Sequence, residues 1–154
     1  MAQEIERKFL LKSDEWRALA TGTAYRQGYL STDKRATVRV RTVGAQGFLT
    51  IKGLTVGAAR SEYEYEIPLA DALAMLESLA EKPLIEKMRY AIPVGGLVWE
   101  VDEFFGENAG LIVAEVELGS EDQVFEKPRW VGGEVTADPR YFNANLVKTP
   151  FSRW

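Results

Sequence analysis

A chain of 154 residues with 46% hydrophobic and 11% aromatic content is long enough for one domain, spanning residues 1–154, with a real core. The absence of cysteine excludes disulfides, a thiolate nucleophile and thiolate metal sites, and the absence of histidine removes the usual general base near neutral pH. The net charge of -4 argues against a nucleic-acid partner bound by overall charge. Without a signal-peptide pattern or an apolar run of about 18 residues, we expect a cytoplasmic protein with no membrane partner.

The first half of the chain is predicted to be mostly strand. Ser13, followed by two acidic residues, predicts the start of a short helix that ends near residue 20. A glycine-containing turn is expected at 44–47, and a flexible loop at 53–59. Alternation of apolar and polar residues predicts strands over residues 4–11, 25–31, 36–43, 48–52 and 60–67.

The second half alternates helices and strands. Leucines on one helical face predict an amphipathic helix over 69–80, a capping-box spacing starts a short helix at Ser120 that Pro128 ends, and Asp138-Pro139 starts a C-terminal helix through residue 147. Strands are predicted at 84–92, 97–104 and 111–118, with a turn at 93–96. About eight consecutive strands joined by tight turns predict an antiparallel β-barrel with helices packed outside, an α+β fold.

Charged residues recur at a spacing of two on these strands, so each set shares one face of its strand. Two interpretations are open. The general expectation is a sheet with one solvated face. However, most strands carry charges of one sign, and the residues between the charges are mostly apolar. The sets are Glu4, Glu6 and Lys8; Arg39 and Arg41; Lys52; Glu62, Glu64 and Glu66; Lys87 and Arg89; Glu100 and Asp102; Glu115 and Glu117.

If the predicted helices cover the apolar side of a closed barrel, the charges must line its lumen. Basic groups in such a lumen would hold phosphate oxygens, and clustered carboxylates would hold a hard divalent cation that bridges to the phosphates. Without histidine or cysteine, any metal must be held by oxygen, which favours Mg²⁺, Mn²⁺ or Ca²⁺. The lumen would then be a site for a polyanion bound together with a divalent metal.

The order of these motifs resembles the CYTH superfamily, the triphosphate tunnel metalloenzymes. Glu4-Ile5-Glu6-Arg7-Lys8 is similar to the ExExK signature of that family, and a lone match of this kind is weak. Here it is followed in order by Arg39-x-Arg41, Leu49-Thr50-Ile51-Lys52, Glu62-Tyr63-Glu64, Glu86-Lys87-x-Arg89-Tyr90, Glu100-x-Asp102, Glu115-x-Glu117 and a tail from Trp130 through Asn143. The resemblance covers essentially the whole chain and is closest in character to the short bacterial members, which resemble inorganic triphosphatases.

The resemblance implies an eight-stranded tunnel that hydrolyses or cyclises triphosphates with Mg²⁺ or Mn²⁺. It assigns roles residue by residue. The metal-binding acids would be Glu4, Glu6, Glu115 and Glu117. The groups that grip the triphosphate would be Lys8, Arg39, Arg41, Lys52, Lys87 and Arg89. The catalytic residues would be Glu62, Glu64, Asp102 and Lys87, of which the three acids would orient the attacking water or hold a second metal.

We expect hydrolysis of a small-molecule triphosphate, with inorganic tripolyphosphate cleaved to pyrophosphate and phosphate. Class IV adenylate cyclase and thiamine triphosphatase are alternatives on the same fold. Outside that class, the chain could be a non-catalytic polyphosphate-binding module or a β-barrel interaction domain with a solvated charged face. The full set of acids argues against the binding module, because phosphate binding alone needs only the basic half. The resemblance is compatible with a homodimer, although no apolar stripe in the sequence marks an interface.

Overall fold

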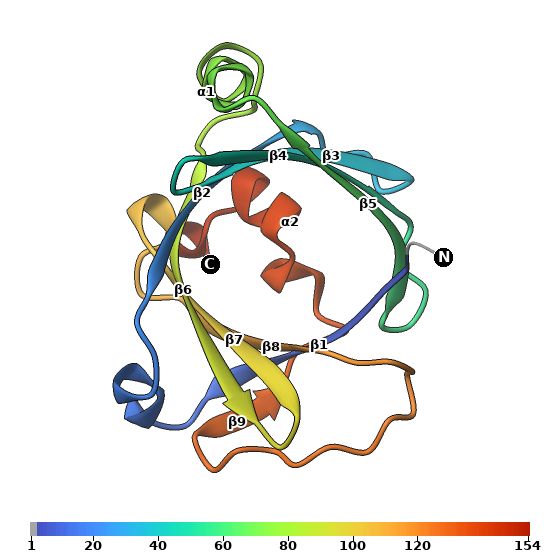
Figure 1. The fold of residues 1–154 in the computed structure, drawn as a ribbon, viewed down its shortest axis with the longest axis vertical. Coiled ribbons are helices and arrows are strands. Elements are labelled where there is room, and N and C mark those ends of the chain that lie inside the picture. The colour runs from blue at the N-terminus through green and yellow to red at the C-terminus, as the bar shows by residue number, and fades with distance from the viewer. Residues whose placement is uncertain (1–2) are drawn as a thin grey trace.

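The strands form a closed antiparallel barrel, which confirms the predicted fold class (Figure 1). The computed structural model describes residues 3–154. In this part of the chain the barrel strands are β1 (Gln3–Leu11), β2 (Thr23–Ser31), β3 (Ala36–Val43), β4 (Gln46–Gly53), β5 (Ala59–Ile67), β6 (Ile85–Val94), β7 (Leu97–Phe104) and β8 (Ile112–Glu117). Their order is β5-β4-β3-β2-β6-β7-β8-β1, and the ring closes where β1 pairs with β5, with Glu4 opposite Arg60.

Two of the tight turns in the barrel depend on glycine. Gly44 follows β3 at φ 58°, and Gly95 and Gly96 join β6 to β7 at φ 57° and 81°. Two-residue hairpins match the twist of their strands when the turn residues adopt positive φ, which glycine does without steric cost. Both turns lie where the sequence predicts them.

The long helix α1 (Leu69–Ser78) packs on the outside of the barrel, as predicted. Its residues Ala72 and Leu76 form a buried cluster with Val40 of β3. Val40 stands between Arg39 and Arg41, so the strand alternation that turns the valine outward turns both guanidinium groups inward. The apolar coat and the charged lumen are therefore two consequences of one pattern.

The C-terminal helix α2 (Asn143–Lys148) does not pack outside, and in the view of Figure 1 it lies within the ring of strands. Its residues Leu146 and Val147 are buried in one cluster with Ile85, Phe104 and Val113. Each of these three residues lies an even number of positions from the charged lumen residues of its own strand, which is β6, β7 or β8. Its side chain therefore points to the same inner side of the barrel. The inner face of the barrel thus changes from charged to apolar at these residues, and α2 packs against the apolar surface that they form.

Two short helices predicted from capping patterns do not form. Residues 13–20 give only one 3₁₀ turn, Glu15–Ala18, which buries Trp16 against the ring of Tyr90. After β8, the Ser120 hydroxyl donates to Asp122, and the Gln123 side chain accepts from the backbone N–H of Gly119. The polar groups that would have capped a helix at Ser120 are therefore used within a turn.

The predicted C-terminal helix is divided into two pieces. Asp138 accepts from the backbone N–H of Arg140 and begins a 3₁₀ turn, Pro139–Tyr141, and α2 follows it. Two further 3₁₀ turns, Gly106–Asn108 and Phe151–Arg153, precede β8 and end the chain. The capping prediction at Asp138 was right, and the continuous helix was wrong.

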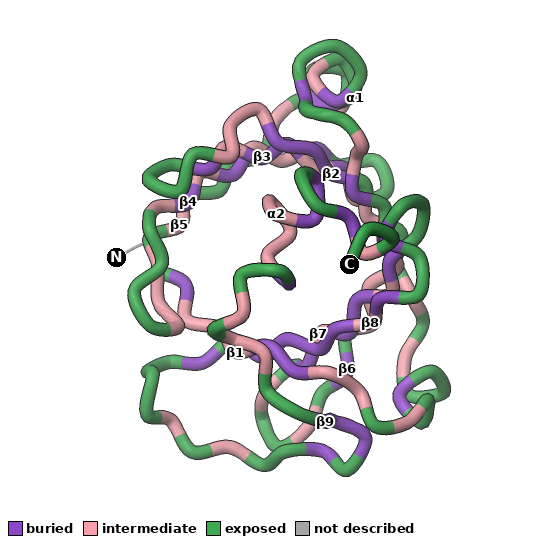
Figure 2. Tube along the Cα trace, turned by 180° about the vertical axis from the view of Figure 1, so that it is seen from behind, coloured by how far each residue is buried: buried purple, intermediate pink, exposed green. Residues whose placement is uncertain are grey.

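A ninth strand, β9 (Val131–Glu134), was not predicted and adds to the end of β1 outside the ring. It helps to cover the largest core cluster, which contains Trp16, Trp99 and Trp130 on the outer side of β1, β7 and β8. Figure 2 shows the buried chain concentrated in the strands and the exposed chain in the loops and along α1. Within residues 3–154, no helix has the length and apolar character needed to cross a membrane.

Candidate active site in the barrel lumen

The inner faces of the strands enclose a charged cavity of about 470 Å³. All of the site residues predicted from the sequence line it, apart from Asp102. Residues of the C-terminal segment around α2 line it as well. Strand alternation accounts for this convergence, since residues two apart on neighbouring strands face the same interior. Of the two interpretations left open by the charge pattern, the lumen is the one the structure adopts.

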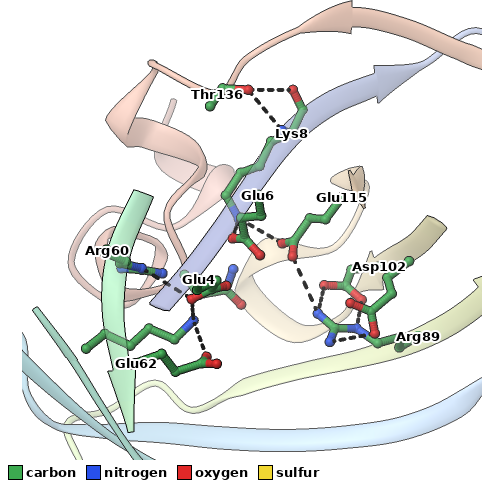
Figure 3. A network of polar contacts seen from close by, with 12 residues as sticks. Glu4, Glu6, Lys8, Arg60, Glu62, Arg89, Asp102, Glu115 and Thr136 are labelled. Carbon is green, nitrogen blue, oxygen red and sulfur yellow. Dashed lines mark hydrogen bonds and ion pairs between the residues drawn. The ribbon is translucent and has the colours of Figure 1, made fainter. Parts of the chain in front are cut away.

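A cluster of carboxylates lies where β1 runs beside β5 and β8 (Figure 3). Glu4 Oε2 lies 2.8 Å from Lys52 Nζ and 3.6 Å from Arg60 Nε. Burial opposes the charge of Glu4, but a hydrogen bond with Glu6 and the two cations hold the pKa of Glu4 well below its ordinary value. Burial, followed by the negative charge of Glu115, raises the pKa of Glu6 to about 8. Near neutral pH, Glu6 is therefore the member of the cluster that keeps its proton.

Lys8 lies between two of these acids because of the pairing of β1 with β8. The register places Lys8 opposite Glu115 and Glu6 opposite Glu117. Lys8 Nζ lies 2.8 Å from Glu115 Oε1 and 3.3 Å from Glu6 Oε1. Burial opposes the charge on Lys8, yet the two carboxylates raise the pKa of this lysine above its ordinary value.

The four acids predicted to bind metal do not form a ready-made site in the described part of the chain. Within residues 3–154, no three carboxylates converge as a ready-made metal site, because Glu4 and Glu115 are turned toward lysines. The chemistry of the donors nevertheless fits a hard cation, since all of them are oxygens. Burial and the charges of Glu4 and Glu62 raise the pKa of Glu117, and Glu4 Oε2 makes no well-formed hydrogen bond although it is buried. A divalent cation would relieve this repulsion.

The opposite wall carries the predicted arginines of β3. Arg39 Nη2 lies 3.5 Å from Glu64 Oε2, and its buried Nε has no hydrogen-bond partner. Arg41 Nε donates to Gln27 Oε1 at 2.8 Å. Burial, together with the positive charge of Arg39 and of a further arginine, lowers the pKa of Arg41 to about 9. Crowded cations and an unused buried donor make this wall suited to a multiply charged anion.

Asp102 lies behind the cavity wall and not on it. Its side chain is fully buried, with Oδ2 at 2.8 Å from Lys87 Nζ and Oδ1 at 2.7 Å from Arg89 Nε. Both oxygens are thus used by cations that do line the cavity. This placement leaves Glu62 and Glu64 as the cavity-lining acids that could orient a water, and it makes Asp102 a support for Lys87 and Arg89.

Lys87 is the most deeply buried cation of the cavity wall, at 2% exposure. Burial lowers the pKa of Lys87 to about 7, with Asp102 opposing the shift and Arg89 and Arg41 adding to it. Near neutral pH a substantial fraction of this side chain is therefore a neutral amine, which can accept a proton.

Several residues of the cavity were missed by the sequence analysis. Arg60 pairs with Glu4. Its spacing of two from Glu62 on β5 places it on the same face as Glu62 and Glu64, so its position in the lumen could have been predicted. The ring centroid of Tyr25 lies 4.9 Å from the guanidinium carbons of both Arg41 and Arg89. Gln27 and Asn143 also join the site, and no spacing rule pointed to either.

Comparison with known proteins supports a single assignment of the fold. The CYTH domain family model matches residues 2–149. The inorganic triphosphatase of Acetivibrio thermocellus is 54% identical over 154 residues, covering 100% of this chain and 99% of the relative. The inorganic triphosphatase of Nitrosomonas europaea is 40% identical over 149 residues, covering 94% and 96%. The crystal structure of the inorganic triphosphatase NE1496 superimposes with a TM-score of 0.63 at 37% identity, covering 93% of this chain and 96% of that one.

Proposed function

The chain belongs to the CYTH domain family, and we propose that it hydrolyses inorganic tripolyphosphate to pyrophosphate and phosphate with the help of Mg²⁺ or Mn²⁺. The observation that carries this proposal is the division of one enclosed cavity into an acidic wall on β1, β5 and β8 and a basic wall on β3 and β6. A site that only bound polyphosphate would need the basic wall alone. Two full-length relatives named inorganic triphosphatase support the same choice of substrate.

The basic wall, together with Lys8 of β1 and Lys52 of β4, would hold the phosphate oxygens. Arg39 brings a buried Nε without a hydrogen-bond partner, and Arg41 is crowded by like charges, so both would gain from an anion. Lys8, Lys52 and Arg89 are paired with cavity carboxylates at present, and a triphosphate would compete for them. A triphosphate carries about four negative charges, so several cations are needed to neutralise it.

The acidic wall would hold the metal. Glu4, Glu6, Glu115 and Glu117 are the residues that would supply its oxygen ligands. When bound, the cation would neutralise phosphate charge and make an adjacent water more acidic. Glu62 and Glu64 line the cavity from β5 and would orient the attacking water by accepting a hydrogen bond from it.

Lys87 would act as the proton acceptor. Lys87 lines the cavity, and with a pKa of about 7 its side chain is available as a neutral amine. In the proposed step an O–H bond of the water breaks, the proton moves to Nζ, and the water oxygen bonds to the terminal phosphorus. The bridging P–O bond breaks, and pyrophosphate leaves with the electron pair. The proton on Nζ then returns to solvent or product.

A substrate panel tests this function. The purified chain is given tripolyphosphate, ATP and thiamine triphosphate with each metal, and phosphate, pyrophosphate and cyclic AMP are measured. We expect phosphate and pyrophosphate from tripolyphosphate at a rate well above that from the other two. Cyclic AMP from ATP would reassign the chain as a cyclase. Tight binding of tripolyphosphate without turnover would reassign it as a binding module.

Arg39→Ala tests the basic wall separately. It should weaken tripolyphosphate binding by about 10-fold to 100-fold, as expected for one lost charge-assisted hydrogen bond. The matched control is Arg35→Ala, because Arg35 is exposed and pairs only with nearby Asp33 among the described residues. Isothermal titration with tripolyphosphate and Mg²⁺ measures both variants. Equal affinity in the two would contradict the proposed role of Arg39.

A further inference from the structure

Asn143, the first residue of α2, reaches into the cavity and contacts the proposed proton acceptor. Its Oδ1 accepts a hydrogen bond from Lys87 Nζ at 3.0 Å and another from Gln27 Nε2 at 3.0 Å. The contact joins a segment near the C-terminus to strands β2 and β6, more than 50 residues away in sequence. Asn143 itself belongs to neither the acidic wall nor the basic wall.

A chain of hydrogen bonds fixes which end of the Asn143 amide faces the lysine. Arg41 Nε can only donate, and it donates to Gln27 Oε1 at 2.8 Å. Gln27 must therefore donate from Nε2 to Asn143, and Asn143 must accept this hydrogen bond with Oδ1. The oxygen that faces Gln27 is the same oxygen that faces Lys87, so the arginine sets the orientation of the asparagine through the glutamine.

Lys87 Nζ has two fixed acceptors, Asp102 Oδ2 at 2.8 Å and Asn143 Oδ1 at 3.0 Å. A neutral amine carries two N–H bonds and one lone pair. If both N–H bonds point to these acceptors, the lone pair must occupy the remaining tetrahedral direction. Lys87 lines the cavity, and proton transfer requires this direction to open toward a water held there and not toward the Phe104 ring, whose centroid lies 5.5 Å from Nζ.

We propose that Asn143 is a positioning residue for hydrolysis, which holds the Lys87 amine so that its lone pair faces the attacking water. This inference rests on the proposed function. Asp102 alone would leave the amine free to rotate about the Cε–Nζ bond, and the second acceptor removes that freedom. A misaligned lone pair lowers the rate of proton transfer without weakening the binding of phosphate.

A purely structural role for Asn143 predicts something different. The burial of Leu146 and Val147 already anchors α2, so a structural asparagine would affect stability and not the protonation of Lys87. The charged groups that act on Lys87 are Asp102 of β7, Arg89 of β6, Arg41 of β3 and Glu115 of β8. All of them remain when Asn143 is replaced, so a change in the titration of Lys87 reports the lost or altered acceptor.

The test compares Asn143→Leu, Asn143→Asp and a matched control, Asn145→Leu, whose side chain donates to the backbone oxygen of Pro139 and not to Lys87. Asn143→Leu should lower kcat by about 10-fold to 100-fold with little change in KM. It should also move the acidic limb of the kcat/KM profile to lower pH, because the ammonium form loses an acceptor. Asn143→Asp keeps an acceptor and adds charge, so its acidic limb should move to higher pH, with activity recovered there.

A second readout does not depend on turnover. Heteronuclear NMR of the Lys87 Nζ group in the ligand-free protein, assigned by its loss in Lys87→Met, should show the same opposite displacements of pKa in the two Asn143 variants. Asn145→Leu should leave that pKa in place. If the wild-type chain hydrolyses no triphosphate, the proposed function fails while the NMR titration still tests the positioning. An active wild type together with an unchanged Lys87 pKa and kcat in Asn143→Leu would overturn the inference, and Asn143→Asp answers the question if the leucine variant does not fold.

Discussion

At the scale of single residues, the lumen concentrates groups whose charge the fold disfavours. Lys87 and Arg41 have lowered pKa values, and Glu6 and Glu117 have raised ones, in each case chiefly through burial. Such groups destabilise the ligand-free protein, and perturbed titration of this kind is concentrated at functional sites. The consequence can be measured as a dependence of stability on pH.

Lys87→Met should remove one component of that dependence. The folded-state pKa of Lys87 is about 7, below the ordinary lysine value of 10.5, so between these values the unfolded chain binds the extra proton. The free energy of unfolding therefore gains a contribution that rises with pH over this window, by at most about 1.4 kcal/mol per pH unit. Glu6, with its raised pKa, acts in the opposite direction below about pH 8 in both proteins.

Urea unfolding of wild type and Lys87→Met across the window from about pH 7 to pH 10 measures the difference between them. The wild type should gain stability relative to the variant as pH rises, since Glu6 and all other groups are common to both. Parallel pH profiles would show that Lys87 titrates normally in the folded protein, which would also remove the support for its role as a proton acceptor.

The face of its strand on which each site residue lies could be predicted from the sequence. Alternation placed Glu4 and Arg39 on the charged faces of their strands, the family resemblance pointed those faces and Lys52 inward, and all three residues line the cavity. What alternation cannot supply is depth along a strand. Asp102 has the right parity but lies behind the wall, where Lys87 and Arg89 cover it. Pair partners such as Lys8 and Glu115 depend on register between strands over 100 residues apart, which no local pattern encodes.

At the scale of elements, the short helices were the least predictable. Capping patterns at Ser13 and Ser120 were present, but isolated helices of a few residues are marginal, so local side-chain bonds decided the outcome. The sequence does contain a signal for the inward placement of α2. The apolar residues Ile85 and Val113 lie on the same faces of their strands as the charged lumen residues, so part of the inner surface is apolar. Their apolar character marks the end of the barrel that the helix closes.

Leu146→Ala tests whether α2 is a packed part of the barrel. Leu146 is fully buried between α2 and the strand residues of the closed end. Its truncation should reduce the free energy of unfolding by about 2–5 kcal/mol through lost burial and a residual cavity. Leu79→Ala at the end of α1 is the control, because Leu79 is 65% exposed and should cost only about 0.5 kcal/mol. Urea unfolding measures both, and equal losses would show that α2 contributes little to the core.

At the scale of the whole molecule, closure of the barrel gives the apolar faces of the strands a common exterior but encloses their charged faces. Closure of β1 on β5 removes the sheet edges and gives the apolar faces a common exterior, which α1 and β9 help to cover. The same closure brings the charges of seven strands, all except β2, into one enclosed space. The strand count and the tight turns predicted the barrel, but the repeated alternation was also compatible with a solvated charged face, and the resemblance to the CYTH superfamily was needed to favour a charged interior.

Ligand binding should therefore stabilise the whole barrel and not only its lumen. Tripolyphosphate with Mg²⁺ would neutralise both walls, and a ligand at about 100 times its dissociation constant adds about 2.7 kcal/mol to the free energy of unfolding. For a domain of this size that corresponds to a rise in Tm of roughly 5–10 °C. Differential scanning calorimetry with tripolyphosphate and Mg²⁺ together, and with each alone, measures the effect, with Arg39→Ala expected to reduce the shift at a fixed ligand concentration. A Tm that stays constant at saturating ligand would contradict a preformed lumen, because a site present only in the folded barrel must couple binding to folding.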